Sequence, residues 1–178
     1  MKISKFFFPI VLATLLLGLT QCDSIKNIEQ NVNGRAVTFD LPPQAAGDYM
    51  VTQEISFNFD SLVSQFDLDL INLAGVKPQS ATISIIDTSA TPVTFDILDN
   101  VELYLESATI PARKIAYKDP VLHTGLITLA LDVDNTNDIL DFANANTVTI
   151  KLKAKLNAAT DHQIQMKVAV QWHIAAEL

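Results

Sequence analysis

The chain has 178 residues, 20 of them acidic and 12 of them Lys or Arg, and its formal net charge is −8. An acidic surface repels the phosphate backbone, so nucleic acid is not expected as a partner. Apolar residues make up 49% of the sequence, which also has 5 glycines and 7 prolines. This composition excludes a disordered or fibrous chain.

The N-terminus has the pattern of an export signal. Lys2 and Lys5 precede an apolar run over residues 6–19, and a basic start followed by such a run is typical of secretory signals. The run is shorter than the roughly 20 residues that a membrane-spanning helix needs. We therefore expect residues 1–21 to be a signal peptide and not a permanent membrane span.

The apolar run ends at Leu19-Thr20-Gln21-Cys22, which holds the single cysteine of the sequence. This motif resembles the lipobox of bacterial lipoproteins, although Gln21 stands where Gly, Ala or Ser is usual. The resemblance covers about the first 22 residues, and it implies cleavage before Cys22 and acylation of the Cys22 thiol. The alternative is a signal peptide that is cut elsewhere and leaves a free thiol. A lone cysteine cannot form an internal disulfide, and lipidation would consume the thiol.

The same resemblance predicts where the protein is located, and the sequence after Cys22 divides into a tether and a domain. The lipid bilayer is the expected partner of acylated Cys22, and the expected location is the cell envelope at the outer membrane, on its periplasmic or surface face. Residues 22–34 are polar and read as a lipidated tether, and residues 35–178 form the domain. The mature chain would have 157 residues (178 minus 21), enough for one domain with a real core. Loss of Lys2 and Lys5 leaves 10 basic and 20 acidic residues, a net charge of −10.

Elements of the first half follow from hydrophobic periodicity. Val37 and Phe39 alternate with polar residues until Pro42-Pro43 ends the run, and alternation over residues 49–59 predicts a long half-buried strand. Residues 61–74 have apolar spacings of three and four, which predict a short helix that ends at Gly75. A strand is expected over residues 79–87.

In the second half, two Asp-Ile-Leu-Asp segments, residues 96–99 and 138–141, each precede a predicted strand. We interpret each of them as a helical turn that packs its Ile and Leu against the core. The strands that follow are expected at residues 101–107 and 147–156, with another at residues 125–132. Residues 157–161 read as a turn that would join residues 147–156 to the alternating residues 163–174 as an antiparallel pair.

These elements predict a mainly β protein, an antiparallel β-sandwich with a few short helical turns between its strands. A barrel-like closed sheet is the alternative. Uneven strand lengths and helical inserts argue against a membrane-spanning barrel.

Two clusters of side chains are candidates for binding. Residues Asp132, Asp134, Thr136 and Asp138 place oxygen atoms at every second position, as a calcium loop does, but Gly and the bidentate Glu of the full motif are missing. A polar turn that caps the next helical turn is the alternative. Arg113, Lys114, Tyr117 and Lys118 form a basic cluster in the irregular residues 110–125, either a partner-binding loop or a loop charged for solubility.

The sequence shows no arrangement typical of catalysis. His123, His162 and His173 lack a metal-binding spacing, and no Gly-rich phosphate loop or serine nucleophile elbow is present. The carboxylate pairs Asp67/Asp69 and Glu102/Glu106 fit a solvated face better than a glycosidase. We therefore expect no cofactor and no enzyme activity. The predicted function is a membrane-anchored lipoprotein that acts as a binding, adhesion or envelope-structural module, with an envelope protein or a glycan as partner. The alternative is a carbohydrate- or small-ligand-binding protein of the envelope.

Overall fold

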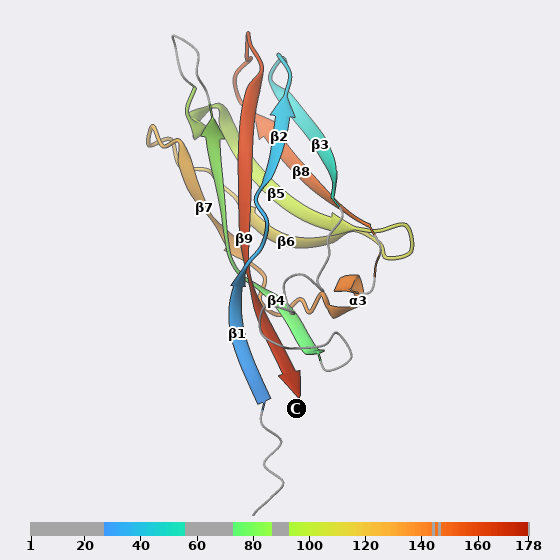
Figure 1. Ribbon diagram of the computed structural model, residues 1–178. Helices are drawn as coiled ribbons and strands as arrows, with labels where there is room; N and C mark the ends of the chain where they lie inside the picture. Colours follow the sequence, from blue (N-terminus) through green and yellow to red (C-terminus); the bar gives the residue numbers. More distant parts are fainter. Residues whose placement is uncertain (1–26, 56–72, 87–92, 144, 146, 178) are drawn as a thin grey trace, which may run out of the picture.

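The computed structural model describes residues 27–55, 73–86, 93–143, 145 and 147–177, and the protein is mainly β (Figure 1). Two short helical turns, η3 (Phe95–Ile97) and α3 (Leu140–Ala143), lie between strands in the described part. The nine strands are β1 (Asn27–Asn33), β2 (Val37–Leu41), β3 (Gly47–Ile55), β4 (Leu73–Ile86), β5 (Leu98–Glu106), β6 (Arg113–Lys118), β7 (Thr128–Val133), β8 (Val148–Leu156) and β9 (Ile164–Glu177).

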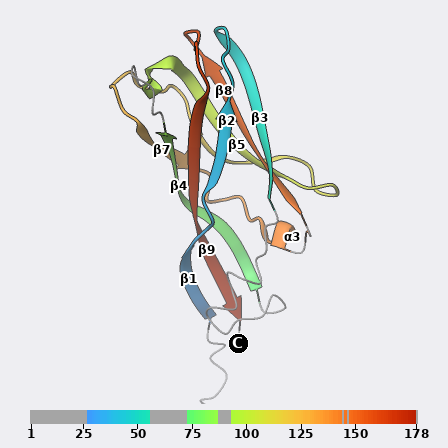
Figure 2. The same ribbon diagram turned by 45° about the horizontal axis from the view of Figure 1, so that its top comes forward.

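All nine strands belong to one antiparallel sheet, which folds over on itself. The strand order is β1-β9-β4-β7-β6-β5-β8-β3, and β2 also pairs with β9. The fold lies between β6 and β7, which share only the residue pairs Ala116↔Val133 and Tyr117↔Asp132. Strands β1, β2, β9, β4 and β7 therefore face strands β6, β5, β8 and β3 (Figures 1 and 2). The predicted antiparallel β-sandwich with helical turns is confirmed.

The barrel alternative requires the two ends of the sheet to meet. Among the described residues, no ladder of strand pairing joins β3 to β1 or β2. One isolated bridge between Gln44 and Thr160 ties two turns together at one end of the sandwich. The sheet thus keeps two edges, β3 on one side and β1 with β2 on the other.

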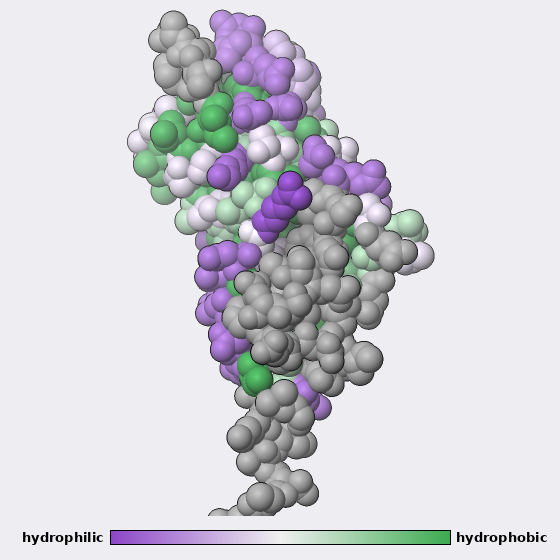
Figure 3. All heavy atoms as spheres, in the orientation of Figure 1, coloured by the Kyte–Doolittle hydropathy of each residue, from purple (hydrophilic) through white to green (hydrophobic). Residues whose placement is uncertain are grey.

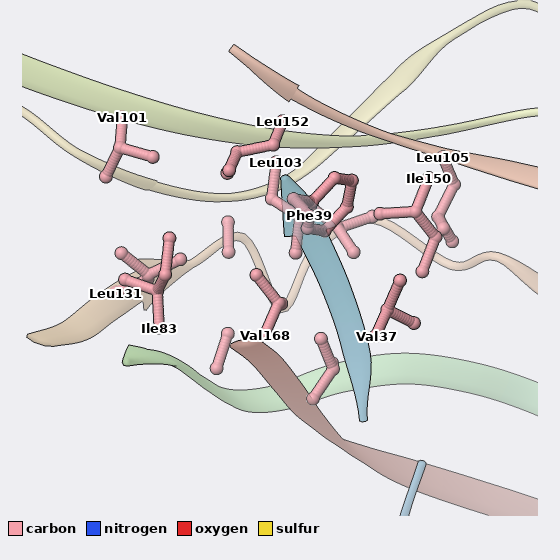
Figure 4. Packing of buried hydrophobic residues seen from close by; sticks show 14 of the residues in the cluster. Val37, Phe39, Ile83, Val101, Leu103, Leu105, Leu131, Ile150, Leu152 and Val168 are labelled. Atoms are coloured by element: carbon pink, nitrogen blue, oxygen red, sulfur yellow. The ribbon is translucent and has the colours of Figure 1, made fainter. Parts of the chain in front are cut away.

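The core lies between the two halves, where alternate side chains of each strand point inward. Phe39 of β2 is 1% exposed and sits between the halves, beside Leu103 and Ile150 of the one and Val168 of the other (Figure 4). Strand β2 alternates strictly between buried and exposed residues, as its sequence predicts. Burial of one face of each strand is the main stabilising contribution of such a sandwich.

Strand β4 corrects the predicted helix end. Leu73 and Gly75 belong to β4, and the rest of the helix predicted over residues 61–74 lies outside the described residues. Pro78 is tolerated inside the strand because it lies at a register shift, where the ladder to β9 is irregular. Two residues earlier, Val76 directs its N–H to Asp138 and its C=O to Ile139, not to β9. At Leu73 and Gly75, pairing with β9 replaces the predicted helix end.

The predicted pair of C-terminal strands is wrong. Strand β8 pairs with β3 and β5, whereas β9 pairs with β1, β2 and β4. The turn between β8 and β9 therefore crosses from one half of the sandwich to the other. Alternation shows which face of a strand is buried. It does not show whether two strands are hydrogen-bonded neighbours or lie opposite each other across the core.

Part of the segment that the sequence analysis assigned to a tether is a strand. Residues Asn27–Asn33 form strand β1, which pairs with β9 from Asn27↔Glu177 to Asn33↔Gln171. Only Ile28 and Val32 of this strand pack against the core. Because the rest of the strand is polar, its sequence lacks the alternation that predicts a strand. The folded domain begins before the predicted boundary at residue 35.

Candidate binding surface

The outer face of strands β8, β5 and β6 carries a group of ion pairs between neighbouring strands. Strand β8 alternates buried residues with Lys151, Lys153 and Lys155, which point outward. The register places Glu102 of β5 opposite Lys153 and Tyr104 opposite Lys151. Cross-strand neighbours on one face lie close enough to form ion pairs. The row of lysines on β8 therefore lies beside Glu102 and Glu106 of β5, with Tyr104 between them.

Glu102 is the centre of this face. Its Oε2 accepts a hydrogen bond of 2.9 Å from the Tyr104 hydroxyl, and its Oε1 accepts one of 3.1 Å from Lys114 Nζ. Lys153 Nζ lies 3.4 Å from Oε2. Three side chains from two neighbouring strands and its own strand thus converge on one carboxylate. We call Glu102, Tyr104, Lys114 and Lys153 the Glu102 network.

The network sets the protonation of its members. Burial would raise the pKa of Glu102, but the hydrogen bonds from Lys114 and Tyr104 outweigh it and lower the pKa below its usual 4.5. The hydrogen bond to Glu102 raises the pKa of Lys114. Burial and the hydrogen bond to Glu102 raise the pKa of Tyr104. Glu102 and Lys114 are therefore held charged at neutral pH, and Tyr104 is held neutral.

The predicted basic cluster lies in strand β6 and not in a loop, which corrects the sequence analysis. Lys114 and Tyr117 both point to the outer face, where Lys114 Nζ lies 5.0 Å from the centre of the Tyr117 ring. Lys118 Nζ pairs with Asp132 of β7 at 3.2 Å. The prolines and charges of this region made the strand hard to predict from the sequence. Its buried residues Ile115 and Ala116 occupy a bulge against Leu103.

The Arg113 side chain does not group with the other three residues and instead binds the segment around α3. Its guanidinium donates to both carboxylate oxygens of Asp141, at 3.0 and 2.7 Å, and to the backbone oxygen of Asp138. It also lies 5.3 Å from the centre of the Phe142 ring. Phe142 is fully buried. The structure therefore divides the predicted cluster into a structural arginine, the pair Lys114 and Tyr117 on the outer face, and Lys118, which pairs with Asp132 of β7.

The calcium candidates do not converge. Asp132 pairs with Lys118. Asp134 Oδ1 accepts hydrogen bonds from the N–H and the hydroxyl of Thr136, at 3.1 and 2.6 Å, and these bonds lower the pKa of Asp134. No group of three or more acidic, His or Cys side chains is placed to hold a metal in the part that the structure describes. Asp134 and Thr136 form the polar turn that the sequence analysis gave as the alternative, whereas Asp132 lies in β7.

Asp138 has a structural task of its own. Its Oδ1 accepts hydrogen bonds from the backbone N–H groups of Leu140, at 2.8 Å, and Val76, at 3.2 Å. The first bond caps the start of α3, and the second satisfies a fully buried strand residue. Ile139 N–H donates to the Val76 oxygen at 2.8 Å. The segment before α3 is thereby joined to β4, while Arg113 joins it to β6.

The histidines and carboxylate pairs considered in the sequence analysis make isolated polar contacts in the structure. His173 Nδ1 lies 3.0 Å from Asn31 Oδ1 across the β1–β9 ladder, and His123 Nε2 lies 3.4 Å from Asn157 Nδ2. Glu106 pairs with Lys151, so neither member of the Glu102/Glu106 pair lacks a cation. Asp67 and Asp69 lie outside the described residues, as does Cys22.

Sequence reasoning missed the Glu102 network as a unit. Glu102 was assigned to a solvated face, but its pairing with Lys153 depends on β5 lying next to β8. The spacing of charges along each strand does not specify which strands are neighbours.

Across the described residues, no helix is long and apolar enough to span a membrane.

Comparisons with known proteins do not assign the chain to a family. No protein-family model and no curated protein matches the chain. Among solved structures, a chain described as turnip yellow mosaic virus is similar over 87% of this chain and 96% of its own, with 14% identity and a TM-score of 0.25. A similarity at this level carries no argument about fold or function.

Proposed function

We propose that the protein is a bacterial envelope lipoprotein, anchored through acylated Cys22, whose β-sandwich is a non-enzymatic binding module. The observation that carries the proposal is the sequence of the N-terminus: two lysines, a 14-residue apolar run (6 to 19) and a single cysteine. Two or more acyl chains on that cysteine would give a lasting anchor, since each buried methylene contributes about 0.8 kcal/mol.

The start of the domain supports this reading. Strand β1 begins at Asn27, so four residues separate it from Cys22. At about 3.5 Å per extended residue, such a tether spans less than about 20 Å. The end of the sandwich where β1 starts and β9 finishes would therefore lie close to the bilayer.

Charge supports a covalent anchor over electrostatic adsorption. The mature chain would carry a net charge of −10, from 10 basic and 20 acidic residues. The lysines of the outer face lie beside carboxylates, Lys151 with Glu106, Lys153 with Glu102 and Lys155 with Asp99. A surface so neutralised offers little attraction for anionic lipid.

The test is fatty-acid labelling of cells that express the full chain with Cys22 or with Cys22→Ala, followed by membrane fractionation. We expect labelling and membrane retention with Cys22 only. Gln21→Ala is the matched control, because it places a small residue before the cysteine and should label at least as well as the parent. Equal labelling of parent and Cys22→Ala would refute the proposal.

A further inference from the structure

The first two strands follow one neighbour from its end to its start. Strand β1 begins at the pair Asn27↔Glu177, and β2 ends at the pair Leu41↔Ile164, so both lie antiparallel along β9 (Figures 1 and 2). On its other side, β9 pairs with β4 over most of its length. We call residues 27–41 the N-terminal segment. This segment therefore lies along a strand that is itself held inside the sheet.

The connection between β1 and β2 is also held to β9. Gly34 N–H donates to the Val170 oxygen at 2.8 Å. A Cβ added at Gly34 would lie 2.5 Å from Trp172 Nε1, so the backbone of the connection lies close against β9. The N-terminal segment is thus fixed to β9 at its middle as well as through its two strands.

Side chains fasten the segment on both of its faces. Inside, Val32, Phe39 and Leu41 are buried in the core. Outside, hydrophilic residues lie over β1, on the lower left of the molecule in Figure 3. Three side-chain contacts cross from this face to β9: Asn31 Oδ1 to His173 Nδ1 at 3.0 Å, Asn33 Oδ1 to Gln171 Nε2 at 3.2 Å, and Asp40 Oδ1 to Gln165 Nε2 at 3.0 Å. Cross-strand pairs of this kind stabilise a sheet.

A backbone bridge closes the segment just beyond β2. Gln44 N–H donates to the Thr160 oxygen at 3.2 Å, and Thr160 N–H donates to the Gln44 oxygen at 2.8 Å. Gln44 N–H also lies 3.0 Å from Thr160 Oγ1. Since Thr160 belongs to the turn before β9, the bridge joins the far end of the segment to the start of β9.

The direction of these strands decides how they respond to tension. Tension on neighbouring ends of two antiparallel strands breaks their hydrogen bonds one after another, whereas tension on opposite ends loads all the bonds together. Asn27, which leads to Cys22, lies beside Glu177 at the end of β9. The turn before β9 lies at the opposite end of the pair. Tension between Cys22 and that turn would therefore load the whole N-terminal segment in shear.

We propose that the N-terminal segment is a shear-resistant attachment, which keeps the domain folded when the far end of the sandwich is pulled away from the bilayer. The inference deepens the proposed function, because it gives a mechanical task to the residues that follow the anchor. It rests on that function for the anchor at Cys22. The pairing along β9, the buried side chains and the outer contacts supply the resistance.

The experiment is single-molecule force spectroscopy of the full chain, with Cys22 as one handle and an introduced cysteine as the other. Ala158→Cys, in the turn before β9, applies tension to opposite ends of the pair, and Glu177→Cys applies it to neighbouring ends. Both residues are exposed, so both variants should keep the parent melting temperature. Forced unfolding depends on the unfolding barrier and not on equilibrium stability. We expect the mean unfolding force of Ala158→Cys to be at least twofold that of Glu177→Cys.

A matched pair of valines locates the point of rupture. Val32→Ala removes buried methyl groups from β1, and Val101→Ala removes the same groups from β5 in the other half of the sandwich. With the Ala158→Cys handle, Val32→Ala should lower the mean unfolding force, and Val101→Ala should lower it less. Asn31→Ala/Asn33→Ala repeats the test without a change in the core, and it should also lower the force.

Two results would overturn the proposal. One is a force with Ala158→Cys that is equal to or lower than the force with Glu177→Cys. The other is an equal loss of force in Val32→Ala and Val101→Ala, which would place the point of rupture outside the N-terminal segment. These measurements use Cys22 as a thiol and do not depend on its acylation. Equal fatty-acid labelling of parent and Cys22→Ala would refute the anchor without changing the forces, so the two failures are distinguishable.

Discussion

Replacement of Asp138 by alanine should destabilise the protein strongly, although Asp138 is only partly buried. The substitution removes the cap of α3, which costs about 1 kcal/mol. It also leaves the N–H of fully buried Val76 without its acceptor, at a cost of about 1–3 kcal/mol. The sum is about 2–4 kcal/mol. At about 2–4 °C for each kcal/mol in a domain of this size, the melting temperature should fall by roughly 5–15 °C.

Thermal unfolding followed by circular dichroism, with calcium or with chelator, tests this reasoning. Asp138→Asn is the matched control, because Asn is also a good capping residue and keeps an oxygen acceptor; it should lose less than about 1 kcal/mol. Asp134→Ala alters an exposed turn and should lose less than Asp138→Ala. Equal, calcium-dependent losses in Asp134→Ala and Asp138→Ala would refute the capping role and favour a calcium loop.

Gly75 offers a second check on the same contact. A Cβ added at Gly75 would lie 2.9 Å from Asp138 Oδ2, so Gly75→Ala should displace a carboxylate that two backbone N–H groups hold. In the Asp138→Ala background that clash is absent. The two substitutions should therefore be non-additive, with the double variant more stable than the sum of the single losses predicts. Strict additivity would mean that the two residues are not coupled.

Three further changes have defined outcomes. Gly34→Ala should lower stability by about 1–3 kcal/mol in urea unfolding, because its Cβ would lie 2.5 Å from Trp172 Nε1; an unchanged midpoint would contradict this packing. Phe39→Ala should cost about 3–5 kcal/mol in the same assay, and a loss below 1 kcal/mol would show that Phe39 is not central to the core. Glu102→Gln should cost about 1 kcal/mol near pH 7. Because the pKa of Glu102 is lowered from 4.5, this difference should persist above that pH and shrink as the pH falls below it; a constant difference would exclude the Glu102 carboxylate as its source.

Periodicity predicted the faces of strands well. The alternation in β2, β8 and β9 identified which residues are buried, because burial of one face is a local property of a strand. The two Asp-Ile-Leu-Asp segments overlap helical turns only in part: Ile97 ends η3 and Leu140 begins α3, whereas Leu98 already belongs to β5. Ile139 and Leu98 are 0% and 1% exposed.

Neighbour relations were harder to predict because they depend on the whole fold. The pairing of β8 with β5, and hence of Lys153 with Glu102, has no signature within either strand. Strand β1 escaped prediction because its polar residues resemble a tether, and pairing with β9 supplies what its sequence lacks. Gly75 was read as the end of a helix, whereas it belongs to β4.

The pairing of β1 with β9 joins residues that are far apart in the sequence: Asn27 and Glu177 are 150 positions apart (177 minus 27). Among the described strands, β1 and β2 pair only with β9. They are made early in synthesis, and they have no partner until β9 is available. Such distant pairing slows folding and leaves strand edges open in the meantime. The polar side chains of β1, which make it look like a linker, are well suited to that interval, because a polar edge resists association with other chains.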